Sequence, residues 1–405
     1  MKKYLVYLLS VLLLATGATA FVGCGTAEDE YIHLLIWHDK EEEVADVLAE
    51  FLAVLEPEIT VTLERKSGLT EALKLVGNDA SNAPDMYFFA HDKIGMYAEM
   101  NIIVPITELV SEESLAGFLD KTIAASTYQG EIYQLPIYFE TLLFMYNKDL
   151  MSENDIPSTT GDLFGFMQRN MGGNSFGFVE QYTNAYFNAG WIHGFGGQII
   201  DEYGVPMLNS PEFIQALEYY RQFVRMMPGE AEFATISTLF REGLAAATIG
   251  GPWLVPGLRN AGIDLGLAPM PIVSETGLPL APYMGVQGIH VLRVATENER
   301  RAEAIGVLLN HLISTDIGVA LAEATGSAPA LEAAFELDII QSNEMVMMMY
   351  ETAQTAIPIP NIPEMDVMWV VTSDLLTEVN LRGEDIETAA NAAQERAEGL
   401  IELMR

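Results

Sequence analysis

Strand-length apolar stretches alternate with amphipathic helical stretches along the first third of the chain. Residues 31–37 (YIHLLIW) form an apolar run typical of a buried strand, and residues 41–55 repeat apolar positions at helical spacing. A second strand is predicted at 59–63, a helix at 69–77 and a third strand at 86–89. This β-α-β-α-β order predicts a mainly parallel sheet with crossover helices.

The α/β alternation continues to the end of the chain, without an internal repeat. Further strands are predicted near 130–136, 142–146, 176–180, 245–249, 265–271 and 289–292. Helices are predicted at 162–170, 186–193, 211–227, 233–242, 299–312, 316–324, 345–355 and 375–403. A chain of 405 residues exceeds one ordinary hydrophobic core. The predicted fold class is therefore α/β, with two lobes.

Acidic residues dominate the charge of the protein. The 57 acidic and 20 basic residues give a formal net charge of −37, spread along the sequence. Such a surface repels phosphate backbones, so nucleic acid is excluded as a partner. Half of the residues are apolar, as in a globular protein. We interpret the acidity as a hypothetical adaptation to a salty medium.

The first 27 residues read as a lipoprotein signal peptide and tether. Two lysines at 2–3 precede an apolar stretch at 4–20, and the only cysteine, Cys24, follows. The run 21–24 (FVGC) resembles a bacterial lipobox, although phenylalanine replaces its usual leucine and valine its usual small residue. We expect lipidation at Cys24 and an extracytoplasmic protein held at the cell membrane. A plain secretory peptide and an uncleaved anchor are the alternatives.

A polar triplet follows the third predicted strand. His91, Asp92 and Lys93 follow Phe89 after one alanine and come before a helical pattern. In open α/β folds, small ligands bind at the carboxyl ends of the strands. Carboxylate, ammonium and aromatic groups together suit a polyhydroxylated ligand such as a sugar. The alternative is that Asp92 only caps the following helix.

Enzyme motifs are absent or misplaced. The sequence has no Walker loop, no H-E-x-x-H and no suitably placed GxGxxG, and its six histidines lack metal-ligand spacing. The G-x-S-x-G string at 173–177 has a predicted helix before it and a strand after it, the reverse of a nucleophile elbow. A glycosidase pair such as Asp92 with Glu140 carries no information among 57 acids. We expect a binding protein that is not an enzyme and has neither metal nor cofactor.

Aromatic residues recur at the ends of predicted strands and in nearby loops. Trp37 ends the first strand, Trp253 follows Gly-Gly-Pro, and Trp369 follows PNIPEMDVM. Tyr186 lies close to Gln181, Tyr182, Thr183 and Asn184, and Glu140 interrupts the apolar segment PIYFETLLFMY. Each residue alone is explained by core packing or structural pairing. Their repeated position predicts a lined cleft.

Four motifs carry a resemblance to a known family: PDxxxxAHD at 84–92, YNKDL at 146–150, GGPW at 250–253 and PNIPxM at 360–365. With them, the chain resembles the maltose/maltodextrin-binding proteins of bacterial ABC importers from about residue 34 to about residue 403. The resemblance implies a two-lobed periplasmic-binding-protein-like fold, with a ligand cleft between lobes joined by crossing strands. The expected lobes are 28–138 with 289–337, and 139–288 with 338–405.

The resemblance also implies a function and a site. The expected function is to bind a maltodextrin-type oligosaccharide and to deliver it, by lobe closure, to the membrane subunits of an ABC permease. We expect the protein to act as a monomer. The candidate ligand-binding residues are Trp37, Asp39, Lys40, Glu64, Phe89, Asp92, Lys93, Glu140, Tyr186, Trp253 and Trp369.

Several positions depart from the family pattern. Phe89 stands where the family has a tryptophan and Lys93 where it has an arginine, while Asn184 replaces a glutamate and Ser373 an arginine. The segment around His38 is shortened. With these changes the cleft remains suited to a sugar, but they do not specify which sugar it binds. The alternatives are another disaccharide or a polyol, a secreted glycosidase, and a surface adhesin or scaffold.

Overall fold

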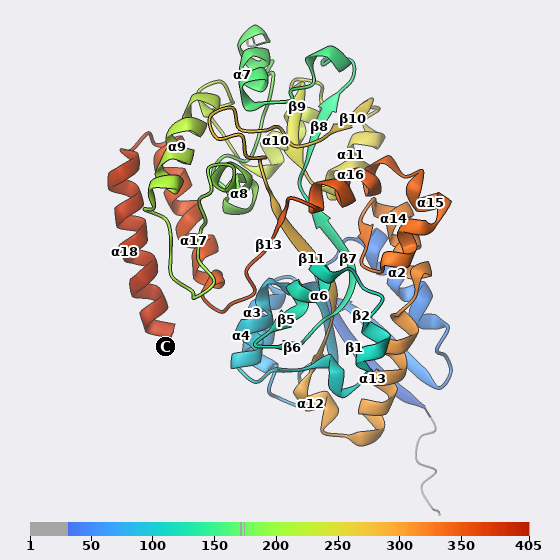
Figure 1. Cartoon of the computed structure of the whole chain (residues 1–405). Coiled ribbons are helices and arrows are strands. Elements are labelled where there is room, and N and C mark those ends of the chain that lie inside the picture. Colours follow the sequence, from blue (N-terminus) through green and yellow to red (C-terminus); the bar gives the residue numbers. More distant parts are fainter. Residues whose placement is uncertain (1–30, 171, 174, 405) are drawn as a thin grey trace, which may run out of the picture.

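The computed structural model describes residues 31–170, 172–173 and 175–404. The predicted signal segment and its lipidation site, Cys24, lie outside the described residues. Figure 1 shows two lobes, the lower one built mainly from the first part of the chain and the upper one mainly from the middle and the end.

The elements follow the α/β alternation expected from the sequence. The strands are β1 (Ile32–His38), β2 (Ile59–Arg65), β3 (Met86–Ala90), β4 (Ile103–Val104), β5 (Thr127–Tyr128), β6 (Glu131–Ile132), β7 (Leu135–Thr141), β8 (Leu143–Asn147), β9 (Ala247–Gly250), β10 (Leu265–Ala268), β11 (Tyr283–Leu292), β12 (Ala328–Pro329) and β13 (Ile357–Pro358). The α-helices are α2 (Glu42–Ala53), α3 (Leu69–Val76), α4 (Ile94–Glu99), α5 (Glu112–Leu115), α6 (Asp120–Ser126), α7 (Thr160–Arg169), α8 (Ala185–His193), α9 (Pro211–Val224), α10 (Phe233–Arg241), α11 (Val255–Asn260), α12 (Arg293–Thr296), α13 (Glu299–Leu312), α14 (Thr315–Thr325), α15 (Asp338–Gln341), α16 (Glu344–Ala353), α17 (Met365–Leu376) and α18 (Ile386–Met404). Two 3₁₀ turns matter for the site, η1 (His91–Lys93) and η4 (Pro252–Leu254).

The lower lobe is built on a sheet of strand order β12-β7-β11-β3-β1-β2. Strand β1 pairs in parallel with both β2 and β3, which confirms the parallel arrangement predicted for the first three strands. Strand β11 is antiparallel to β3 and to β7. Apolar side chains from β1 and β3, such as Leu34 and Phe88, form a core with α2, α13 and α14. The carboxyl ends of β1 and β3 therefore point their following loops toward the upper lobe.

The upper lobe has a smaller sheet of order β10-β8-β9. Its core is rich in aromatic side chains, including Phe144, Phe178, Trp191 and Tyr220. Helices α8 and α9 pack against each other, and α17 and α18 cover the outer side of α8 and α9 (Figure 1). Helix α8 thus contacts α9, α17 and the strand β11.

The lobes are joined by strands that pass from one to the other. Only Leu142 separates β7, in the lower sheet, from β8, in the upper sheet. Strand β11 runs along β7, and its first residues also pair with β13 (Figure 1). The expected lobe boundaries at 138/139 and 288/289 fall within β7 and β11.

Two predicted elements were wrong. Residues 176–180 do not form a strand and contribute only isolated bridges, one of them between Val179 and Thr248. The helix expected over 375–403 is two helices, α17 and α18, because the chain leaves the helix near Arg382 and Gly383 adopts a positive φ of 78°. Glycine adopts this conformation without the steric cost that other residues pay. Strand β11 is also longer than the predicted 289–292, because it is buried along its whole length and shows no alternation.

Within the described residues, no helix by itself has the length and apolar composition needed to cross a bilayer. Helices α13 and α14 meet that criterion only as a pair, and they are bent by 65° with respect to each other. Their side chains Leu308, Leu309 and Leu321 are buried in the core of the lower lobe.

Candidate functional site

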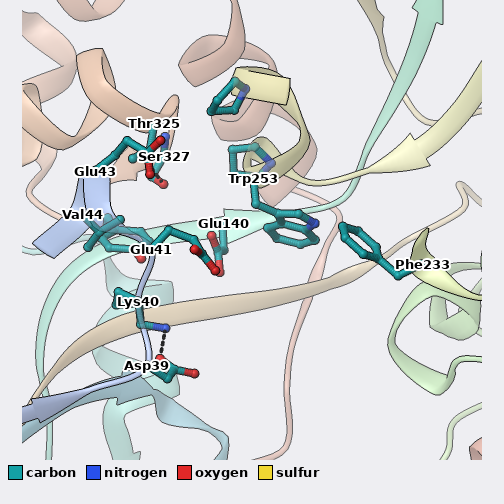
Figure 2. A pocket seen from close by; sticks show the side chains of 13 residues that line it. Asp39, Lys40, Glu41, Glu43, Val44, Glu140, Phe233, Trp253, Thr325 and Ser327 are labelled. Carbon is teal, nitrogen blue, oxygen red and sulfur yellow. Dashed lines mark hydrogen bonds and ion pairs between the residues drawn. The ribbon is translucent and has the colours of Figure 1, made fainter. Parts of the chain in front are cut away.

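Two adjoining cavities lie between the lobes. Cavity A, of about 530 Å³, is lined by Asp39, Lys40, Glu41, Glu43, Val44, Tyr138, Glu140, Phe233, Pro252, Trp253, Pro256, Thr325 and Ser327 (Figure 2). Cavity B, of about 420 Å³, is lined by Ala90, Asp92, Glu140, Asn184, Tyr186, Trp253, Gly285, Gln287, Ile359, Trp369 and Ser373. The two cavities share Glu140 and Trp253, so they adjoin each other, and together they are called the groove.

The upper-lobe wall of cavity B is aromatic. The ring of Tyr186 lies between those of Trp253 and Trp369, with 6.4 Å between ring centroids on each side. The three residues come from α8, η4 and α17, which are far apart in the sequence. Trp253 is 36% exposed, so its face is available to an occupant of the groove. Such a row of rings can cover the apolar C–H faces of a sugar.

Gly251 allows Trp253 to take this position. A Cβ atom at residue 251 would lie 2.2 Å from two ring carbons of Trp253, closer than any real contact. The indole therefore folds back over the backbone of its own Gly-Gly-Pro-Trp turn, which only glycine permits. The GGPW motif thus fixes the direction of the ring.

Two family departures hold Tyr186 in place. Asn184 caps α8, because its Oδ1 accepts hydrogen bonds from the backbone N–H groups of Tyr186 (2.9 Å) and Phe187 (3.3 Å). The hydroxyl of Ser373 accepts from the N–H of Ala185 at 3.1 Å. These two side chains border cavity B and position the aromatic wall, with no charge of their own.

The wall opposite the rings is polar and carries carboxylates. Glu140, on β7, accepts a hydrogen bond from Nε2 of Gln287 at 2.9 Å. Burial raises the pKa of Glu140, and nearby Asp39 adds to this effect, while Lys40 and the Gln287 hydrogen bond oppose it. Asp39 and Lys40 follow β1 and form an ion pair of 2.9 Å (Figure 2). Carboxylate and amide oxygens here are acceptors for hydroxyl donors.

Asp92 and Lys93, which are adjacent in η1, have different environments. Asp92 lines cavity B, and its Oδ2 accepts from Nε1 of Trp369 at 3.3 Å, a contact between the two lobes. Lys93 borders neither cavity; its ammonium lies 2.8 Å from Oδ1 of Asp366 on α17 and 3.2 Å from Oδ2 of Asp92. Burial favours the neutral form of Lys93, but the two carboxylates outweigh it and raise its pKa. Lys74 binds the other oxygen of Asp366 at 2.9 Å.

Three further candidate residues lie away from both cavities. Trp37 is 7% exposed and donates its Nε1–H to Oε2 of Glu64 at 2.9 Å. Lys66 bonds to Oε1 of Glu64 at 2.7 Å, which lowers the pKa of that carboxyl, and it lies 4.4 Å from the Trp37 ring centroid. Phe89 is half-buried, with the ammonium of Lys40 at 5.3 Å from its ring centroid. Their polar groups are already paired within the protein.

Sequence reasoning missed several cleft residues. Phe233 lies beside Trp253 in cavity A (Figure 2), and Gly285 and Gln287 line cavity B from β11. Gln287 lies in the apolar run 283–289 (YMGVQGI), where a single amide would have been the available signal. Within the described residues, no group of three His, Cys, Asp or Glu side chains is arranged to hold a metal ion.

Residues 48–348 match the family described as bacterial extracellular solute-binding protein. The chain belongs to this family. This solute-binding protein is 30% identical over 358 residues to the maltodextrin-binding protein MdxE of Bacillus subtilis, covering 84% of this chain and 82% of the relative. It is 26% identical over 412 residues to the galactooligosaccharide-binding protein of the same organism, covering 96% of each.

Among solved structures, the solute-binding protein is similar to the maltose/maltodextrin-binding domain MalE from Bdellovibrio bacteriovorus bound to maltotriose. The TM-score is 0.80 at 26% identity, over 91% of this chain and all of the other. The resemblance predicted from the motifs and the two-lobed α/β fold are both confirmed. These relatives are named as binding proteins, which agrees with the expectation of a binding function.

Proposed function

We propose that this solute-binding protein takes up maltodextrin-type oligosaccharides for an ABC importer. The observation that carries the proposal is the groove in which the carboxylates of Asp92 and Glu140 face the rings of Tyr186, Trp253 and Trp369. The relatives named for maltodextrin and maltotriose support the same ligand class. The galactooligosaccharide relative supports a second candidate, another neutral oligosaccharide.

The two walls of the groove have complementary tasks in this proposal. The rings remove water from sugar C–H faces, each contributing about 1 kcal/mol beyond buried area. Hydrogen bonds from sugar hydroxyls to carboxylates contribute about 1.5–3 kcal/mol each and fix the orientation of the sugar. Because the rings lie on the upper lobe while Asp39 and Asp92 lie on the lower one, a bound sugar bridges the lobes and favours the closed state. The permease then recognises the closed form.

The proposed contacts fall into two groups. Asp39, Lys40, Asp92, Glu140, Tyr186, Trp253 and Trp369 line the groove and are proposed to touch the ligand. The other candidate residues are proposed to support the residues that contact the ligand without lining the groove themselves: Trp37, Glu64, Phe89 and Lys93. The lobes are proposed to divide at 138/139, 288/289 and 337/338, with the protein acting as a monomer.

The test is a thermal-shift and calorimetric screen of the purified protein without residues 1–23. The ligands are maltose, maltotriose, maltotetraose, a galactooligosaccharide, trehalose, sucrose and a polyol. A rise in Tm with the glucose oligosaccharides, stronger than with the other sugars, supports the proposal. Product release from maltotetraose would instead indicate a glycosidase, and no shift with any sugar would indicate an adhesin or scaffold.

We further propose that the protein is exported and anchored by a lipid on Cys24. The support is the sequence alone, a charged and then apolar segment ending in Gly-Cys. In a bacterial host, the full-length chain is expected in the membrane fraction, with an N-terminal lipopeptide beginning at Cys24 by mass spectrometry. Cys24→Ser should move the protein to the soluble extracytoplasmic fraction or leave its signal uncleaved, and a wild-type N-terminus without lipid would refute the assignment.

A further inference from the structure

Strand β11, which joins the lobes, carries two cavity residues that neither the motifs nor the resemblance had assigned a role. Gln287 and Gly285 both line cavity B. They are two positions apart on one strand and therefore face the same side of the sheet. Gln287 is 5% exposed, as a core residue would be, yet its side chain is polar.

The amide of Gln287 is satisfied on one side only. Its Nε2 donates to Oε1 of Glu140 at 2.9 Å, and this bond fixes the amide plane. Its Oε1 is buried, and none of the residues described in the structure donates a hydrogen bond to it. A buried carbonyl oxygen without a donor is costly, and such atoms in native proteins call for an explanation. The donor expected here is an occupant of the cavity.

The glycine at 285 has no structural need to be glycine. Its φ is not positive, and a Cβ atom there would meet its nearest neighbours, on Ile359, Gln287 and Glu140, at 3.9–4.0 Å, which is ordinary contact. Glycine weakens a strand interior and often marks a place where a ligand approaches the backbone closely. The absence of a side chain at Gly285, beside Gln287, therefore indicates space for a ligand.

We infer that Gln287 is a specificity-determining residue that reads one hydroxyl of the bound sugar, and that Gly285 makes room for that sugar ring. This inference rests on the proposed function. Glu140 holds the amide so that Oε1 is the free group, and this oxygen can only accept. The ligand must therefore present a hydroxyl donor at this point. Among its described lining residues, cavity B has two carboxylates and no lysine or arginine, so the class is a neutral saccharide and not a sugar acid or sugar phosphate.

The first test uses Gln287→Met, which keeps the length and removes the polar atoms. Calorimetry with maltotriose should show affinity about 10-fold lower than that of the wild type, as expected for one lost hydrogen bond in a buried site. Monodeoxy maltotrioses identify the hydroxyl. One of them should bind the wild type about 10-fold less tightly than maltotriose binds the wild type. The same deoxy sugar and maltotriose should bind Gln287→Met with equal affinity.

Comparing the two proteins across these sugars distinguishes a direct hydrogen bond between Gln287 and the sugar from an indirect role in orienting Glu140. If Gln287 acts only by orienting Glu140, every deoxy sugar keeps the same relative affinity in both proteins, and the inference is wrong. Equal maltotriose affinity of Gln287→Met and the wild type would also overturn it. If the wild type binds none of the sugars while folded, the proposed function fails and this inference fails with it.

Gly285→Ala tests the space independently. Because the added methyl meets no close neighbour, Tm should stay within about 2 °C of the wild type. Maltotriose affinity should fall at least about 5-fold, because the methyl enters the cavity. Unchanged affinity with unchanged Tm would show that the space is not used. A maltobionate ligand should bind the wild type at least about 10-fold less tightly than maltose does, and equal binding would contradict the neutral class.

Discussion

The two walls of the groove differ in chemistry as clearly as the two lobes differ in fold. The lower lobe supplies oxygen acceptors from the ends of its parallel strands, Asp39 after β1 and Asp92 after β3. The upper lobe supplies rings from helix starts and turns, with Tyr186 between Trp253 and Trp369. Sheet edges collect polar side chains, while the aromatic core of the upper lobe extends to its surface. Neither lobe alone therefore supplies both the row of rings and the carboxylates of Asp39 and Asp92.

The largest effect is expected from the aromatic wall. Trp253→Ala and Trp369→Ala should each lower maltotriose affinity by about 10- to 100-fold, since each removes a stacking face worth about 1.5–3 kcal/mol. Isothermal calorimetry measures the change. Tyr203→Ala, at a ring 77% exposed in the same lobe and outside both cavities, is the matched control and should bind normally. Normal binding by either tryptophan variant would remove that ring from the site.

A second comparison concerns two glutamates, Glu140 in the groove and Glu180 sealed in the upper lobe. Oε2 of Glu180 accepts from Nε1 of Trp191 and from the hydroxyl of Tyr220, each at 2.8 Å. Burial raises the pKa of Glu180 to about 8 against these two bonds. The folded state therefore holds a proton that the unfolded chain releases near its ordinary pKa of 4.5. This contribution to stability is complete below about pH 4.5 and is lost as the pH rises toward 8.

Glu180→Gln should remove that pH dependence. The difference in unfolding free energy between variant and wild type should shift in favour of the variant by a few kcal/mol from pH 5 to pH 8, at about 1.4 kcal/mol per pKa unit. Urea unfolding at the two pH values measures it. Glu140→Gln is the paired variant, expected to weaken maltotriose binding about 10-fold with little change in stability. If Glu180→Gln weakens maltotriose binding and Glu140→Gln removes the pH dependence of stability, the roles assigned to the two carboxyls are wrong.

Asp366 tests how far the lobes are held together by charge. Asp366→Asn removes ion pairs to Lys74 and Lys93 and should cost about 1 kcal/mol, because the carboxylate is 30% exposed and partly screened. The expected sign is a Tm lowered by a few degrees at 0.05 M NaCl, with a smaller deficit at 1 M NaCl. Asp374→Asn, on α17 like Asp366, breaks an exposed pair with Arg396 of α18 and should change Tm by less. An equal loss of Tm in both variants would show that the ion pairs of Asp366 with Lys74 and Lys93 stabilise the protein no more than an exposed pair does.

The smallest effect expected is that of salt on the wild type. A net charge of −37 places many carboxylates near one another, and counterions reduce their repulsion. Raising NaCl from 0.1 to 1 M should increase Tm by a few degrees in a scanning-calorimetry series. A flat or falling Tm would contradict the idea that the surface is adapted to a salty medium.

Local sequence pattern predicted much of the frame of the molecule. The first three strands were placed because apolar runs and helical spacing alternate clearly between residues 31 and 89. Asp92 and Trp253 were singled out because they follow a predicted strand and a glycine turn, and Glu140 because it interrupts an apolar segment. The break between α17 and α18 was missed, because helical spacing continues on both sides of Gly383.

Pairing between distant residues could not be read from the sequence. Lys93 looked free beside Asp92, but its second partner, Asp366, lies 273 positions further along the chain. Trp37 looked like a stacking face, but its indole is bonded to Glu64. Gln287 carried too little signal inside a buried strand. Spacing reports which face of an element is buried, and it does not report which distant side chain meets that face.

The single residue between β7 and β8 has a kinetic consequence. In the proposed lobe closure, groups on the connecting strands would move least, so Glu140 and Gln287 would stay in place while Trp253 and Trp369 move toward them. An arriving sugar can form its first bonds before the lobes move. Association should then depend mainly on the carboxylate and amide beside the pivot, and residence time mainly on the rings that arrive afterwards.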